Sequence, residues 1–303
     1  MEYLKNVLQK LNRLSLMGKI GAFVILIILV IGLFGNLLSF YPHNIPGGNA
    51  LEAPSLKHWL GTDDLGIDIW AQICYGARIS VFIGLSTAVL SGIGGSIIGV
   101  IAGYFGKKID KIIMRLTDII IVLPDLPVMI VLGAFFGPDI KNIIIVLSLF
   151  LWTFPARIIR SKILSVKEEK YFLAAKSYGA GLKHLFFRHF IPHISPLIMI
   201  SMIRIVNRAI IAEASLAFLG LGDPASKSWG MILNRAINFK GIYFTDFWKW
   251  WVLSPVIALL LLVISVGFIS RDVEKIFNSK AYYRQNFNKN SKLRGKVCFR
   301  KGC

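Results

Sequence analysis

Cysteine and charged residues are both scarce in this sequence of 303 residues. Its three cysteines are Cys74, Cys298 and Cys303, and they form no C-x-x-C pair, which argues against a disulfide framework and against a zinc site. Only 17% of the residues are charged, whereas an average soluble domain has about 25%. The composition therefore points away from a soluble globular domain.

Motifs for nucleotide binding and for hydrolysis are missing as well. No G-x-x-x-x-G-K-[ST] occurs, which excludes phosphate binding by a P-loop, and neither H-E-x-x-H nor G-x-S-x-G is found. His189 and His193 are four residues apart, but Pro192 lies between them, and we expect interfacial hydrogen bonds there rather than a metal. The sequence predicts no catalytic site, no metal and no cofactor.

Long apolar runs are what the sequence has instead. Hydrophobic residues make up 55% of the chain, and the mean hydropathy is +0.64. Six runs come near the roughly 20 residues that cross a bilayer, at 19–40, 79–104, 116–136, 142–156, 195–219 and 248–269. The first lacks a small-x-small cleavage pattern, so we expect it to stay as an anchor. Since helices satisfy their own backbone in lipid, the predicted fold is all-α, a polytopic membrane protein with six transmembrane helices.

The distribution of Lys and Arg predicts the orientation of these spans. Twenty-six of the 35 basic residues lie in segments on the side of the N-terminus, at 1–19, 105–115, 157–194 and 270–303, and seven lie on the opposite side. By the positive-inside rule, both termini and the loop 157–194 are cytoplasmic. The net charge of +19 then reflects topology and contact with anionic membrane lipid, and it does not indicate a nucleic-acid partner.

These spans divide the chain into four parts. We expect a cytoplasmic N-terminal segment at 1–18, a first helix with an outer segment at 19–78, a core of five transmembrane helices at 79–270, and a disordered basic tail at 271–303. Within the second span, Gly95, Gly99 and Gly103 recur every four residues, a pattern that favours close packing of helices rather than chemistry.

The loop 157–194 contains a basic and aromatic stretch that is too polar to cross the membrane. Its spacing predicts a helix over 170–178 with one face made of Tyr171, Ala174, Ala175 and Tyr178. Gly179 and Gly181 predict a bend, and a second short helix is expected to end at Pro192. Such a segment either seats in the groove of a partner protein or lies among lipid headgroups.

Residues 174–192, AAKSYGAGLKHLFFRHFIP, resemble the cytoplasmic loop of the permeases of binding-protein-dependent ABC importers. Leu173 stands where that family usually has a glutamate. The resemblance implies that this loop forms coupling helices that enter a cleft of the ATPase subunit. The implied coupling residues are Tyr171, Ala174, Ala175, Tyr178, Gly179, Leu182, His189 and Pro192.

Two further stretches narrow the resemblance. GTDDLGID at 61–68 with GARIS at 76–80, and EASLAFLGLG at 213–222 with SWG at 228–230, are similar to the dipeptide/oligopeptide/nickel group. The resemblance is to the C-type permease subunit, and it implies a homologous B-type permease, two ABC ATPase subunits and an extracytoplasmic substrate-binding protein as partners in the cytoplasmic (inner) membrane. The implied cargo is a short peptide or a nickel complex. The alternatives are a self-contained secondary transporter or channel, and a membrane scaffold that only tethers an ATPase.

Four ionisable residues fall within the predicted spans: Asp125, Arg204, Arg208 and Glu213. Because charge in a membrane is costly, they are candidates for a polar substrate pathway. The alternative is that they pair with the partner permease, or that Arg204 extends to the inner surface. Asp118 follows Arg115 by three residues, and we expect these two to pair structurally.

Overall fold

A computed structural model of the protein describes residues 14–181 and 184–300. Within these ranges the chain is helical, and its one β pairing is an isolated bridge between Thr62 and Asp68. The helices are α2 (Leu16–Leu38), α3 (Ile69–Phe105), α4 (Lys107–Val122), α5 (Asp125–Phe136), α6 (Ile140–Leu151), α7 (Thr153–Lys167), α8 (Lys170–Ser177), the π-helix η1 (Leu185–Phe190), α10 (Ile191–Phe218), α11 (Trp229–Asn238), α12 (Trp248–Trp251) and α13 (Leu253–Arg300). The all-α fold class predicted from the sequence is confirmed.

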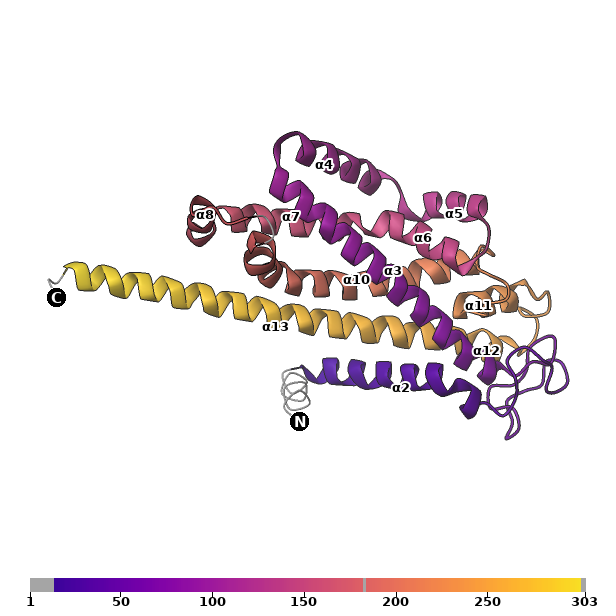
Figure 1. Ribbon diagram of the computed structural model, residues 1–303. Coiled ribbons are helices and arrows are strands. Elements are labelled where there is room, and N and C mark those ends of the chain that lie inside the picture. The colour runs from indigo at the N-terminus through magenta and orange to yellow at the C-terminus, as the bar shows by residue number, and fades with distance from the viewer. Residues whose placement is uncertain (1–13, 182–183, 301–303) are drawn as a thin grey trace.

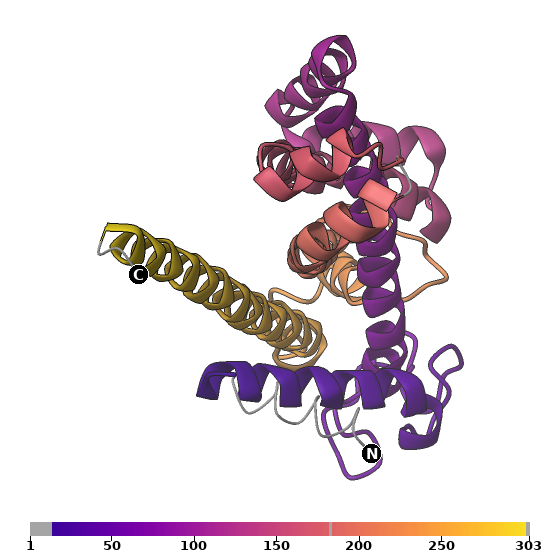
Figure 2. The ribbon, with the colours of Figure 1, turned by 60° about the vertical axis from the view of Figure 1, so that its left-hand side comes forward.

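The long helices cross one another at various angles, but together they run between two distinct ends of the molecule (Figure 1). One end carries α8, the start of α2 and the end of α13; we call it the α8 end. The other carries residues 39–68, α11 and α12; we call it the loop end. Figure 2 shows α2 on one side of the molecule and α4 on the opposite side, with α3 between them.

In the part of the chain that the structure describes, five helical runs are long and apolar enough to cross a membrane: Leu16–Gly35, Ile69–Phe105, Ile140–Lys167, Leu185–Phe218 and Trp248–Phe277. A sixth span is obtained only by counting α4 and α5 together, although they meet at a bend of 93°. The prediction of a single helix over 116–136 is therefore wrong in its geometry. Pro124 has no N–H to continue α4, and it holds Leu123 in an extended conformation with ψ 136°.

Two other predicted spans are longer in the structure. The fourth, predicted over 142–156, is part of a run from Ile140 to Lys167 that is interrupted only at Trp152. The last continues in α13, whose helical backbone extends over 271–300. This segment contains no proline that would end the helix.

The glycine stripe of α3 packs directly on the backbone of α7. A Cβ added at Gly95 would lie 2.3 Å from the carbonyl oxygen of Trp152, and one added at Gly99 would lie 2.5 Å from that of Ala156. At Gly103 it would lie 2.8 Å from the Cβ of Ile163. The packing role expected for these glycines is confirmed, because no other residue leaves room for this approach.

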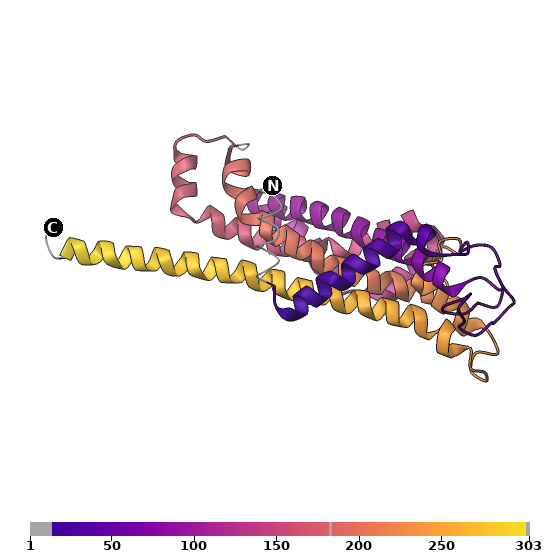
Figure 3. The same ribbon diagram turned by 90° about the horizontal axis from the view of Figure 1, so that it is seen from below.

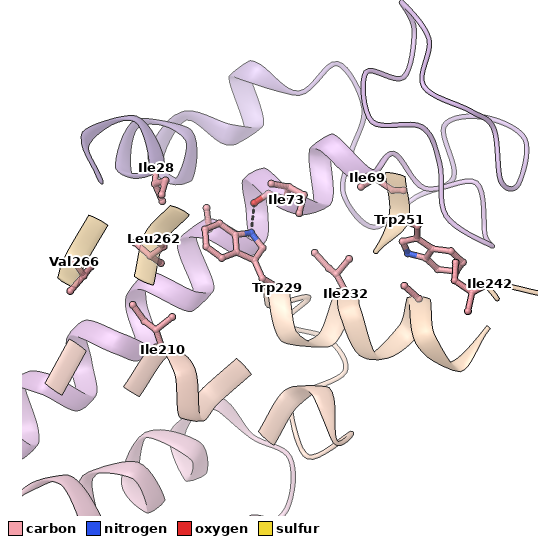
Figure 4. Packing of buried hydrophobic residues seen from close by; sticks show 12 residues of the cluster. Ile28, Ile69, Ile73, Ile210, Trp229, Ile232, Ile242, Trp251, Leu262 and Val266 are labelled. Atoms are coloured by element: carbon pink, nitrogen blue, oxygen red, sulfur yellow. Dashed lines mark hydrogen bonds between the residues drawn. The ribbon is translucent and has the colours of Figure 1, made fainter. Parts of the chain in front are cut away.

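At the loop end, a second buried cluster joins α2, α3, α10, α11 and α13 (Figure 4). Trp229 is 1% exposed, and its Nε1 donates a 2.9 Å hydrogen bond to the carbonyl oxygen of Ile73. Trp251 is fully buried beside Ile242. Because each indole fills a large volume between helices, this cluster fixes α11 against the ends of α3 and α10.

The glycine stripe generates a test with a control on the same helix. Gly95→Val places a side chain against the carbonyl of Trp152, whereas Gly94 has no atom within 4 Å of an added Cβ. We expect Gly95→Val to destabilise the purified chain by about 1–3 kcal/mol through overpacking. Gly94→Val should leave the unfolding midpoint in detergent within the error of the wild type. Equal midpoints for the two variants would contradict the assigned packing.

Candidate functional site

The chain between α7 and α10, residues 168–190, stands out sideways from the bundle at the α8 end (Figure 3). We call it the α8 loop. Its helix α8 ends at Ser177, and Gly179 follows with a φ of +79°, a conformation that favours glycine. The expected helix and the expected bend at Gly179 are therefore both present. Leu182 lies outside the residues that the structure describes.

A buried aromatic base holds this loop against the bundle. Phe172, Leu185 and Phe190 are each 2% exposed or less, and they pack with Ile159 and Ile163 of α7. The rings of Phe172 and Phe190 stack with their centroids 5.1 Å apart. The sequence analysis missed Phe172, because a single buried residue on a short helix creates no apolar stripe.

The helix face predicted from the sequence points mostly outward. Tyr178 is 92% exposed and Leu173 51%, and Ala174 is also exposed, while Ala175 is half-buried. Tyr171 is 41% exposed, but its hydroxyl lies 2.9 Å from Nε2 of His193. The α8 loop thus presents apolar and aromatic side chains to its surroundings, while its base is buried against α7.

Pro192 does not end the second helix, contrary to the prediction. The N–H of Ile191 donates to the carbonyl of Phe186, five residues back, so η1 runs directly into α10. Pro192 sits in the first turn of α10, where a missing N–H is tolerated. His189 is half-buried and stacks on Tyr171 with the ring centroids 5.6 Å apart.

Two of the four predicted intramembrane charges come together across the bend of the third span. Arg208 Nη2 of α10 donates to Asp125 Oδ2 in the first turn of α5, at 2.8 Å. Arg204 Nη2 donates to Glu274 Oε2 of α13 at 2.5 Å, and its guanidinium lies 5.7 Å from the ring centre of Phe154. The sequence analysis could not identify Glu274, which lies beyond the span predicted to end at 269.

Glu213 lies apart from these ion pairs. It is 1% exposed, and no salt bridge joins it to Arg208 or Asp125 in the described part of the chain. The expected pair of Asp118 with Arg115 is not found, because Asp118 pairs with Arg157 of α7 instead.

Two cavities of about 440 Å³ each adjoin the arginines of α10. The first is lined by Arg204, Asn207, Arg208, Ser270 and Glu274, among others, and it lies between α10 and α13. The second is lined by Asp125, Thr153, Arg157 and Arg208, among others. Arg208 and Phe154 line both cavities.

At the loop end, the motif at 61–68 forms a compact hydrogen-bonded turn. Asp63 is fully buried, and its Oδ1 accepts 2.9 Å hydrogen bonds from the backbone N–H groups of Leu65 and Ile67. Its Oδ2 accepts from Gln72 Nε2 at 2.8 Å. Arg235 Nε donates to the adjacent Asp64 at 3.0 Å. These residues of the motif serve the structure of the loop end.

Lys227 ties the start of the loop 39–68 to the segment before α11. Its Nζ donates a 2.7 Å hydrogen bond to the carbonyl oxygen of His43. Burial lowers the pKa of Lys227, with a further contribution from the charge of Arg235, although Asp63 and Asp64 oppose the shift. Within the described residues, no group of three or more His, Cys, Asp or Glu side chains could hold a metal ion.

Comparisons with known proteins agree with this architecture. Residues 95–280 match the family described as binding-protein-dependent transport system inner membrane component. The chain is 37% identical over 246 residues to a putative peptide permease protein of Brucella suis biovar 1, with 80% of each chain covered. It is 38% identical to the dipeptide transport system permease protein DppC of Bacillus subtilis strain 168 over 232 residues, which cover 75% of this chain and 71% of DppC. The oligopeptide transport system permease protein OppC of the same strain is also 38% identical, over 228 residues that cover 75% of this chain and 74% of OppC.

The family match spans more than half of the chain. It includes the α8 loop, the helix α11, and Arg204 and Arg208 of α10. It confirms the resemblance that the three sequence motifs indicated. The chain therefore belongs to the family of binding-protein-dependent transport system inner membrane components, as a multi-pass permease subunit.

Proposed function

We propose that this chain forms half of the translocation channel of an ATP-driven importer of short peptides. The observation that carries the proposal is the α8 loop, an exposed aromatic helix on a buried base, in a chain whose relatives are named peptide permeases. The relatives given above are named for peptides, which favours a peptide over the nickel complex that the motifs also allowed. The chain itself would catalyse no reaction.

The α8 loop is the proposed contact with the ATPase subunits. Tyr178 at 92% and Leu173 at 51% exposure can enter a cleft of a partner, while Phe172 keeps α8 attached to α7. Leu173 would contribute an apolar contact where relatives have a carboxylate. Closure of the two ATPases on ATP would move this loop and shift the channel between outward-open and inward-open states.

The proposed orientation has the α8 end in the cytoplasm, together with both termini. The loop end would then face outward and receive substrate from an extracytoplasmic binding protein. A homologous B-type permease would supply the other half of the channel. The excess of Lys and Arg in the segments near the α8 end supports this orientation.

The proposed pathway runs beside Asp125, Arg204 and Arg208. Their side chains are between 38% and 54% exposed in this chain, which is expensive in lipid but suited to an aqueous cavity. Glu213 was also predicted for the pathway, but its side chain is only 1% exposed, which favours a role in packing. The pathway would lie against the missing partner permease.

Coupling can be tested at the bend of the α8 loop. Gly179 has a φ of +79°, whereas Gly181 has no positive φ, and an added Cβ meets nothing within 4 Å at either position. An alanine at Gly179 strains the backbone by about 1–2 kcal/mol. We expect Gly179→Ala to lower the peptide transported per ATP hydrolysed in the reconstituted complex. Gly181→Ala is the matched control. If the two variants transported the same amount of peptide per ATP hydrolysed, the bend at Gly179 would have no role in coupling.

Orientation can be tested with two exposed tyrosines at opposite ends. Tyr178 is 92% exposed at the α8 end, and Tyr243 is 72% exposed at the loop end. In a Cys298→Ser, Cys303→Ser background, we expect Tyr178→Cys to react with a membrane-impermeant maleimide only in inside-out vesicles. Tyr243→Cys should react only in right-side-out vesicles. The reverse pattern would overturn the proposed topology.

The function is tested in vesicles that contain this chain, its permease partner, both ATPases and the binding protein. We expect uptake of a radiolabelled tripeptide that requires ATP and stops when both ATPases carry a substitution that blocks hydrolysis. A self-contained transporter would continue uptake with those ATPases. That outcome would refute the importer and favour the alternative.

A further inference from the structure

Two arginines on one side of α10 each hold a carboxylate of a different helix. Arg204 and Arg208 are one helical turn apart, so that their side chains lie on the same face of α10. Arg208 reaches Asp125 of α5, and Arg204 reaches Glu274 of α13. The structure records one hydrogen bond from each of these guanidinium groups in the described part of the chain. Since a guanidinium has five N–H donors, each arginine keeps donors for another acceptor.

The surroundings of these arginines contain more positive than negative charge. The cavity between α10 and α13 is lined by Arg204, Arg208 and Arg271 but by only one carboxylate, Glu274. The cavity on the other side is lined by Arg157 and Arg208 and by the carboxylate of Asp125. The first space therefore suits an anion, whereas in the second Arg157 is paired with Asp118 and Arg208 with Asp125.

A buried polar atom of a residue that lines the first cavity has no hydrogen-bond partner among the described residues. Asn207 lies between the two arginines in sequence and lines the same space, and its buried Oδ1 accepts no hydrogen bond from any described residue. A buried amide oxygen without a donor costs free energy. Because this oxygen has almost no accessible surface, a ligand in the cavity reaches it only if the surrounding side chains move.

We propose that Arg204 and Arg208 form a binding site for the terminal carboxylate of a short peptide as it passes through the channel. This inference rests on the proposed function and names the chemical group that the pathway recognises. Arginine binds a carboxylate through paired N–H donors, a geometry that lysine does not offer. The peptide carboxylate exchanges with Asp125 or Glu274, so that one ion pair replaces another.

Exchange of this kind suits a transport pathway. A site for passing substrate must attract it strongly enough for entry and weakly enough for release. Asp125 and Glu274 keep the arginines occupied between substrates, and they return to the arginines when the peptide leaves. Asp125 therefore competes with the peptide carboxylate for Arg208. Removing the Asp125 carboxylate should strengthen binding of the peptide carboxylate, whereas removing the Arg208 guanidinium should weaken it.

The test measures binding of trialanine and of trialanine amide to the purified complex of this chain, its permease partner and the ATPases, without the binding protein. Equilibrium dialysis with radiolabelled peptide gives the ratio of the two affinities. We expect the wild type to bind trialanine with about tenfold higher affinity than its amide, because only the free carboxylate forms a charge-assisted pair with the arginines. Arg208→Gln should reduce this preference to about twofold or less, and Asp125→Asn should increase it.

Controls separate a binding role from a structural one. Arg160 of α7 pairs with Asp110 at 2.6 Å away from both cavities, and Arg160→Gln should keep the wild-type preference. Arg208→Lys keeps the charge but loses the paired donors, so we expect its preference for trialanine over the amide to lie between those of the wild type and Arg208→Gln. This variant replaces Arg208→Gln in the test if Arg208→Gln fails to fold. If Arg208→Gln and Asp125→Asn change the preference equally, or if the wild type binds both peptides alike, the site is refuted.

Failure of this inference is distinct from failure of the proposed function. A complex that imports peptides with ATP but binds trialanine and its amide equally has the function without this site. A complex that takes up no peptide with ATP lacks the function itself, whatever it binds.

Discussion

The backbone contact between α3 and α7 is the constraint on which the rest of the molecule depends. Lipid offers helices no hydrophobic driving force toward each other, so close packing must supply the attraction. Gly95, Gly99 and Gly103 allow that packing because their missing side chains admit the backbone and side chains of α7. The same turns of α7 carry Ile159 and Ile163, which form the base of the α8 loop. The glycines of one helix thus fix the position of a loop that they do not touch.

The broken third span shows how polar groups are kept within the bundle. Pro124 ends α4 and leaves the chain to restart at Asp125, whose carboxylate is then directed to Arg208 of α10. An interrupted helix is tolerated in a membrane only where neighbouring protein or a cavity satisfies it. The ion pair and the adjoining cavity meet this condition together. The break after α4, the Asp125–Arg208 ion pair and the adjoining cavity therefore depend on one another.

Much of this architecture could be predicted from the sequence, because apolar runs, glycine spacing and charge placement are local patterns. The position of the spans, the bend at Gly179 and the outward face with Tyr178 follow from such patterns. The partners of the charges could not be predicted, since Glu274 and Arg157 come from other helices, and a hydropathy profile contains no information on pairing. The span predicted over 195–219 was too short because proline in a sequence suggests a stop, whereas the helix continues through Pro192, which lies in the first turn of α10 directly after the π-helix.

The unbroken run from η1 into α10 has a mechanical consequence. Leu185 belongs to the buried base of the α8 loop, and Arg208 lies 23 residues further along, about 35 Å away at about 1.5 Å per residue. A tilt of this helix by about 5° around its α8 end displaces Arg208 by about 3 Å over that length. The Arg208–Asp125 pair is only 2.8 Å long. Under the proposed coupling, a tilt of this size at the α8 loop would therefore be enough to open or close this ion pair, about 35 Å away along the helix.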